Sequence, residues 1–88
     1  MRRTFTANIH LYSTAGRRVA AAACLLYIDV EPFTRTQWGG TLSEIAAEQP
    51  LHDGSYLLRL PDGRTPRIAL TLAADGCATF TGEGAIAI

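Results

Sequence analysis

Three short segments that end in glycine constrain how this chain can fold. They are Thr14-Ala15-Gly16, Pro61-Asp62-Gly63 and Ala74-Asp75-Gly76. Each has the form of a three-residue hairpin loop, in which a type I turn is followed by a left-handed residue, and glycine adopts that conformation without steric cost. The sequence therefore predicts three antiparallel hairpins, with the glycine of each loop at positive φ.

The same loops predict which residues face each other, because residues opposite one another in an antiparallel pair share one face of the sheet. The predicted pairs are Leu11 with Val19 and Phe5 with Leu25 in the first hairpin, Leu58 with Pro66 and Tyr56 with Ile68 in the second, and Leu72 with Ala78 and Leu70 with Phe80 in the third. All of these pairs are apolar. A two-residue loop at Asp62-Gly63 would instead set Leu58 against Arg67, because a shift of one residue turns every side chain to the other face.

Alternating or apolar stretches around the loops predict five or six strands. Residues 3–12 alternate, with Phe5, Ala7, Ile9 and Leu11 on one face, as in a half-buried strand. Four further strands are predicted over residues 34–42, 55–60, 66–73 and 77–82. Residues 43–49 have two interpretations: a short helix after the capping-box spacing of Thr41 to Glu44, or the tail of the preceding strand.

Residues 19–30 are ambiguous in the sequence. Four consecutive alanines favour a helix, whereas the apolar run from Cys24 to Ile28 favours a strand. We predict a long, bent strand whose register places Val19, Ala21, Ala23 and Leu25 on the core face. Leu26, Ile28 and Val30 would then point outward, unless a β-bulge near residues 24–26 switches the alternation.

These elements predict a single all-β domain over residues 1–88. A small antiparallel β-barrel, or a strongly curled sheet of five to six strands, avoids leaving two long apolar edges exposed. Its predicted interior contains Phe5, Leu11, Trp38, Leu58, Leu70 and Phe80. The alternative is an α+β fold in which a helix at 19–30 covers a flat antiparallel sheet.

Charge and composition limit which binding partners and which cellular location are expected. The formal net charge is zero, which gives no general attraction for nucleic acid or an anionic membrane, and no membrane partner is expected. The two cysteines, Cys24 and Cys77, are read as reduced, buried thiols of a cytoplasmic protein. All eight basic residues are arginine, and together with the abundant alanine this indicates a GC-rich, bacterial genome.

No catalytic, metal-binding or cofactor-binding motif is recognisable. Cys24 and Cys77 are the available nucleophiles and His10 and His52 the available bases, but nothing in their spacing brings a cysteine and a histidine together. We therefore predict a non-enzymatic protein without cofactor or metal, and keep a small enzyme only as a third, background alternative.

The first functional hypothesis is a protein-interaction or structural module. Leu26, Ile28 and Val30 would form an uncovered apolar face if they point outward, and such a face marks an interface. A homodimer is the smallest assembly that would cover this apolar face, so a homo-oligomer is expected.

The alternative hypothesis is a nucleic-acid or nucleotide-binding barrel. In the first hairpin Tyr12 is predicted opposite Arg18 and Ser13 opposite Arg17, with His10 on the same outward face as Tyr12. An aromatic ring beside guanidinium groups suits base stacking and phosphate contact. The candidate binding residues are therefore His10, Tyr12, Arg17 and Arg18.

Overall fold

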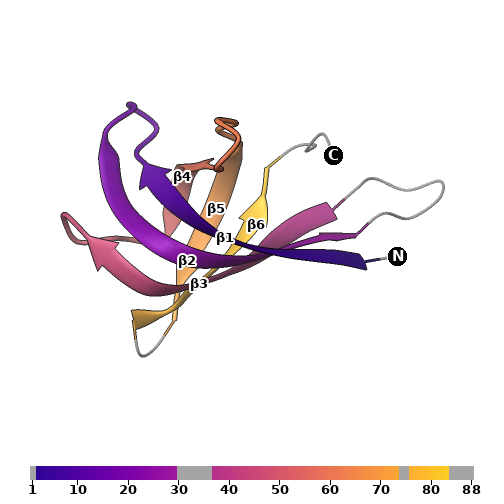
Figure 1. Ribbon diagram of the computed structural model, residues 1–88. Coiled ribbons are helices and arrows are strands. Elements are labelled where there is room, and N and C mark those ends of the chain that lie inside the picture. The colour runs from indigo at the N-terminus through magenta and orange to yellow at the C-terminus, as the bar shows by residue number, and fades with distance from the viewer. Residues whose placement is uncertain (1, 30–36, 74–75, 84–88) are drawn as a thin grey trace.

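The fold is a closed barrel of six antiparallel strands. The computed structural model describes residues 2–29, 37–73 and 76–83. The strands are β1 (Arg2–Tyr12), β2 (Arg18–Asp29), β3 (Gln37–Ala47), β4 (Gly54–Arg59), β5 (Arg67–Leu72) and β6 (Ala78–Gly82), and they close in the order β1-β2-β3-β6-β5-β4 (Figure 1). The predicted all-β barrel is therefore confirmed. None of the described residues belongs to a helix long and apolar enough to cross a membrane.

Both ambiguous segments are strands. Residues 18–29 form β2, so the alternative of a helix covering the sheet is wrong. β3 continues through Ser43 to Ala47, and the segment after Thr41 is therefore a strand tail and not a helical turn. In both segments pairing with neighbouring strands, a tertiary effect, overrides the local preference for helix.

The glycines of the three hairpin loops have the predicted positive φ. Gly16, Gly63 and Gly76 have φ values of 90°, 93° and 72°. In the second loop the Gly63 nitrogen donates a hydrogen bond to the Leu60 carbonyl at 2.9 Å, which closes the turn. Each glycine thus occupies the left-handed region, where a side chain carries a steric cost.

We expect Gly63→Ala to lower the free energy of unfolding by about 1 kcal/mol. A Cβ at this position would meet no atom within 4 Å, so the cost comes from the left-handed backbone and not from a collision. Urea denaturation followed by circular dichroism measures this change. Exposed Thr65→Ala, in the same loop region, is the control and should leave stability nearly unchanged; an equal loss in both variants would contradict the prediction.

The second and third hairpins also have the predicted registers. Tyr56 pairs with Ile68 across β4 and β5, and the Leu58 nitrogen bonds to the Pro66 carbonyl at 2.9 Å. Leu70 pairs with Phe80, and Leu72 with Ala78, across β5 and β6.

The first hairpin departs from its predicted register after the Tyr12–Arg18 pair. Tyr12 lies opposite Arg18 as expected, but Leu11 lies opposite Ala20 and not Val19. Val19 is thus an extra residue in β2, the mark of a β-bulge. All pairs beyond it are shifted by one, so that Phe5 faces Leu26 in place of Leu25.

This bulge reverses the two faces of β2. The predicted switch near residues 24–26 lies instead at Val19, and the buried residues of the strand beyond it are Ala20, Ala22, Cys24, Leu26 and Ile28. The predicted outward position of Leu26 and Ile28 is therefore wrong, and Leu25, predicted to be inside, is 47% exposed. Val30 lies outside the described residues.

A second bulge bends β3. Ala21 pairs with Ala46 and Ala23 with Ser43, so the two residues Glu44 and Ile45 face the single residue Ala22. Glu44 has a φ of 51°, the left-handed conformation that bulges accommodate. β1, β2 and β3 curve strongly and extend together on one side of the barrel (Figure 1).

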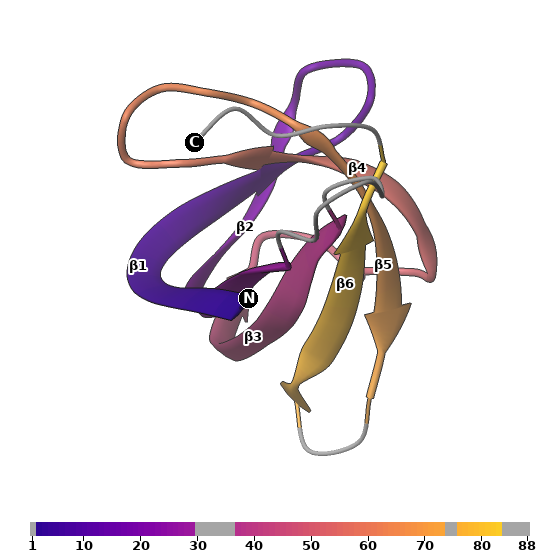
Figure 2. The same ribbon diagram turned by 90° about the vertical axis from the view of Figure 1, so that its right-hand side faces the viewer.

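The core fills the barrel interior. Its largest fully buried side chains are Ile9, Leu11, Val19, Leu42, Leu58, Ile68 and Leu70, and Trp38 and Phe80 meet edge to face with ring centroids 6.3 Å apart. Five of the six predicted interior residues are buried. The exception is Phe5, which is 44% exposed, because the part of β1 that carries it extends beyond the end of β4 (Figure 2).

Candidate functional site

The predicted nucleic-acid patch keeps its position beside the first hairpin loop. His10, Arg17 and Arg18 are exposed and Tyr12 is half-buried. The Ser13 nitrogen bonds to the Arg17 carbonyl at 2.7 Å, as the predicted pairing requires. However, a nitrogen of the Arg18 guanidinium lies 2.8 Å from a carboxylate oxygen of Glu48, so an acidic residue already balances this charge.

An arginine from β4 joins this patch. Arg59 lies opposite His10 where β1 and β4 close the barrel. Its guanidinium donates to the Tyr12 hydroxyl at 3.4 Å and lies 6.0 Å from the centre of the Tyr12 ring. Arg59 could not be predicted from the sequence, because the β1–β4 pairing joins segments far apart in the chain and leaves no local signal.

Two of the three predicted interface residues lie inside the barrel, and the third, Val30, lies outside the described residues. Leu26 and Ile28 are buried in the barrel core, which removes the reason for expecting an interface on them. Of the two cysteines predicted to be buried, Cys24 is buried, but Cys77 is exposed, so the prediction for Cys77 is wrong. Burial raises the pKa of the Cys24 thiol to about 11, which suppresses its nucleophilic thiolate. Within the described ranges, no three His, Cys, Asp or Glu side chains cluster as metal ligands would.

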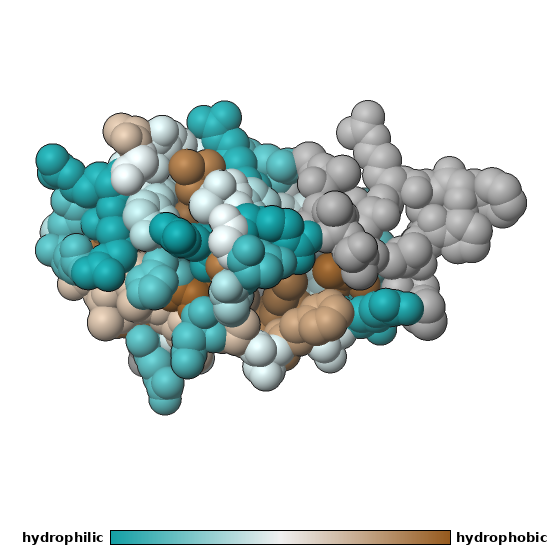
Figure 3. All heavy atoms as spheres, turned by 45° about the horizontal axis from the view of Figure 1, so that its top comes forward, coloured by the Kyte–Doolittle hydropathy of each residue, from teal (hydrophilic) through white to brown (hydrophobic). Residues whose placement is uncertain are grey.

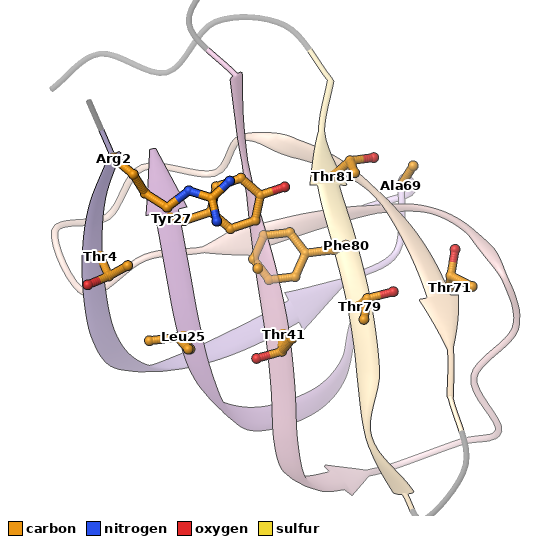
Figure 4. A pocket seen from close by; sticks show the side chains of 11 residues that line it. Arg2, Thr4, Leu25, Tyr27, Thr41, Ala69, Thr71, Thr79, Phe80 and Thr81 are labelled. Carbon is orange, nitrogen blue, oxygen red and sulfur yellow. The ribbon is translucent and has the colours of Figure 1, made fainter. Parts of the chain in front are cut away.

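A shallow hollow lies on the outer face of the sheet. It has a volume of about 380 Å³ and is rich in threonine, with Thr4 from β1, Thr41 from β3, Thr71 from β5 and Thr79 and Thr81 from β6 (Figure 4). Leu25 and Tyr27 of β2 complete one side. These side chains share a face because cross-strand partners do, as with Thr41 and Thr79 or Thr79 and Thr71.

One end of this outer hollow is closed by an ion pair. The Arg2 guanidinium lies 4.5 Å from the centre of the Tyr27 ring and donates to both carboxylate oxygens of Asp29, at 2.8 and 2.9 Å. These hydrogen bonds lower the pKa of Asp29. Because the Arg2 guanidinium is already bound to Asp29, the hollow offers a ligand mainly threonine hydroxyl groups around an apolar centre.

A second cavity, of about 360 Å³, is lined by residues of β1, of β2 and of the hairpin of residues 60–64. β1 forms one wall with Phe5, Ala7 and Ile9, the hairpin of residues 60–64 forms the other, and Leu26 and Ile28 of β2 lie between them. We call this cavity the β1 groove. Its lining is mostly apolar, with Thr6, Asp62 and Arg64 as the polar members. Figure 3 shows that apolar side chains are exposed at several places on a mostly polar face of the molecule.

The β1 groove lies beside an unpaired strand edge. β1 pairs with β2 along its whole length, but on its other side it pairs with β4 only at His10, Leu11 and Tyr12. Residues 2–9 of β1 therefore have no second partner strand among the described residues. Native proteins protect such edges with charge, proline or a bulge, yet the segment from Thr4 to Ile9 carries none of these.

The comparisons with known proteins add no relative. No family model, no curated protein and no solved structure matches this chain. The candidate site therefore depends on the geometry of the chain itself, in which an unprotected strand edge lies beside an apolar cavity.

Proposed function

We propose that this protein is a non-catalytic protein-interaction module that binds through the edge of β1 and the β1 groove. The observation that carries the proposal is the uncharged edge of residues 4–9, which pairs with no second strand of the described chain and lies beside an apolar cavity. Exposed backbone donors and acceptors bind another chain by β-augmentation, and an adjoining apolar cavity adds specificity. We also infer a cytoplasmic, bacterial setting, since the cysteines are not joined in a disulfide and the chain is arginine-rich.

Retention of host proteins on the tagged barrel tests this function. We expect cell proteins to be retained by the native chain and lost on Phe5→Lys, because a lysine at an edge strand opposes pairing. Leu25→Lys is the matched control, since Leu25 has a similar exposed fraction, 47% against 44%, but lies on the outer face of the sheet. Equal retention by both variants, or no retention by the native chain, would refute the proposal.

A second candidate function is binding of single-stranded nucleic acid beside the first hairpin. The observation that favours it is the position of Arg59, whose guanidinium lies against the Tyr12 ring and which pairs with exposed His10 across β1 and β4. Arginine over an aromatic ring is a common arrangement for base and phosphate contact.

Fluorescence anisotropy with a labelled single-stranded oligonucleotide tests this candidate. Binding should weaken steeply with added salt, because phosphate contacts release counterions. It should also weaken on Tyr12→Ala and Arg59→Ala, whereas Arg64→Ala, on the other hairpin, serves as the control for lost charge. Nuclease treatment in the retention experiment separates the two functions, since only nucleic-acid-mediated retention is lost with nuclease.

A further inference from the structure

The pairing of β1 with β4 ends because β4 turns away. β4 follows β1 as far as Arg59, opposite His10. The next residue, Leu60, bonds through its nitrogen to the Arg64 carbonyl at 2.9 Å, and Pro61 has no backbone N–H with which to continue the ladder. The position beside β1 that β4 would occupy past Arg59 is therefore filled by no strand of the described chain.

A strand that continues the line of β4 would present its side chains in a fixed pattern. It would run antiparallel to β1. Because Arg59 lies opposite His10, the same register puts Leu60 opposite Ile9, and the added strand would begin opposite Asn8. Residues opposite Ala7 and Phe5 would share their face and point into the β1 groove. Residues opposite Asn8, Thr6 and Thr4 would point outward.

The chemistry of the groove selects apolar side chains at the two inward positions. The cavity between its walls is lined by Leu26 and Ile28, and the two charged residues on its rim neutralise each other, with Arg64 Nε 2.7 Å from an Asp62 oxygen. Ala7 is small, which leaves room for a branched side chain opposite it. Past Phe5, exposed Arg3 forms no ion pair with a described residue and favours an acidic residue opposite it.

The two walls of the groove favour a single peptide over a second copy of this chain. If a second copy docked through its own β1, its β2 would lie along the other edge of that strand. That β2 would meet the hairpin of residues 60–64, which forms the opposite wall. An extended peptide has no neighbouring strand and therefore avoids this collision.

We propose that the β1 groove binds an extended peptide segment of another protein, antiparallel to β1, with two alternate apolar side chains in the groove and an acidic residue near Arg3. This inference rests on the proposed function and specifies its partner. The bound segment acts as an added strand of the barrel and covers the exposed Phe5 ring.

Two labelled peptides of identical composition test the proposal by fluorescence anisotropy. The first, acetyl-Ser-Ile-Thr-Val-Thr-Glu-Ser-amide, has the required alternation; the second, acetyl-Ile-Val-Ser-Thr-Thr-Ser-Glu-amide, does not. We expect the first to bind at least tenfold more tightly. Hydrogen exchange of the amides of residues 2–9 should slow when it binds, because the added strand pairs with this edge.

Matched variants locate the bound peptide. Ala7→Phe fills the groove and should weaken binding at least tenfold, whereas Asn8→Phe places the same ring on the outer face and should change binding less than twofold. Circular dichroism checks that both variants fold, and Phe5→Lys provides a second blocking variant. Equal binding by the two peptides, or equal binding by the Ala7→Phe and Asn8→Phe variants, would overturn the proposal.

The remaining outcomes either assign the groove to a different occupant or separate this inference from the proposed function. A dimer that Ala7→Phe dissociates, together with absent peptide binding, assigns the groove to a second copy and overturns the peptide. Peptide binding only after removal of residues 84–88 assigns it to the chain's own Gly-Ala-Ile-Ala-Ile sequence. If neither peptide binds but host proteins are still lost on Phe5→Lys, this inference fails while the proposed function stands.

Discussion

Ile28→Glu is expected to abolish folding of the barrel. Ile28 is 3% exposed and lies in the core, whose described residues include no buried polar or charged group that could stabilise a carboxylate. Its cross-strand partner Arg3 is exposed, so an ion pair with Arg3 would require the carboxylate to leave the core. An unpaired charge at such a position costs about 5 kcal/mol or more, which is the whole stability of many small domains. Circular dichroism and the dispersion of amide resonances measure the loss of fold.

Leu25→Glu is the control for this prediction. Leu25 lies three residues earlier in β2 but on the outer face, and its side chain is 47% exposed. The variant should remain folded, with a change in unfolding free energy within about 1 kcal/mol. If Ile28→Glu instead gives a folded monomer, β2 faces the opposite way, and the interface predicted from the sequence on Leu26 and Ile28 returns.

The register of β2 was difficult to predict because its sequence does not distinguish two faces. From Val19 to Ile28 all residues are apolar apart from the Tyr27 hydroxyl, so a shift by one residue exposes no charge and breaks no alternation. The second and third hairpins were predictable because polar and apolar residues alternate beside their loops. A wrong register there would bury an arginine such as Arg67.

Only one wall of the β1 groove could be predicted. The alternation of residues 3–12 places Phe5, Ala7 and Ile9 on one face, and that face is the wall formed by β1. The opposite wall depends on where β4 meets β1. This contact joins distant parts of the chain: Tyr12 and Arg59, which share a hydrogen bond, are 47 positions apart. No local pattern encodes such a contact, and Arg59 was missed beside Tyr12 for the same reason.

Gly82→Ala is expected to lower the free energy of unfolding by about 3 kcal/mol, although it adds only a methyl group. Gly82 lies opposite Ile68, as the hairpin register predicts, and the space above it is filled by the indole ring of Trp38. A Cβ at this position would overlap that ring. The ring has little room to move, because it is 3% exposed and packs against Phe80. Urea denaturation monitored by tryptophan fluorescence measures the loss.

A double-mutant cycle shows whether the Trp38 ring is the cause. Trp38→Leu by itself leaves a cavity and destabilises the barrel, but the cycle subtracts that cost. When leucine replaces the ring, the added methyl group has space, and Gly82→Ala should cost about 1 kcal/mol or less. Circular dichroism must follow unfolding in this background, since the only tryptophan has been removed. An equal cost of Gly82→Ala in both backgrounds would mean that the backbone of β6, and not the indole ring, requires glycine at this position.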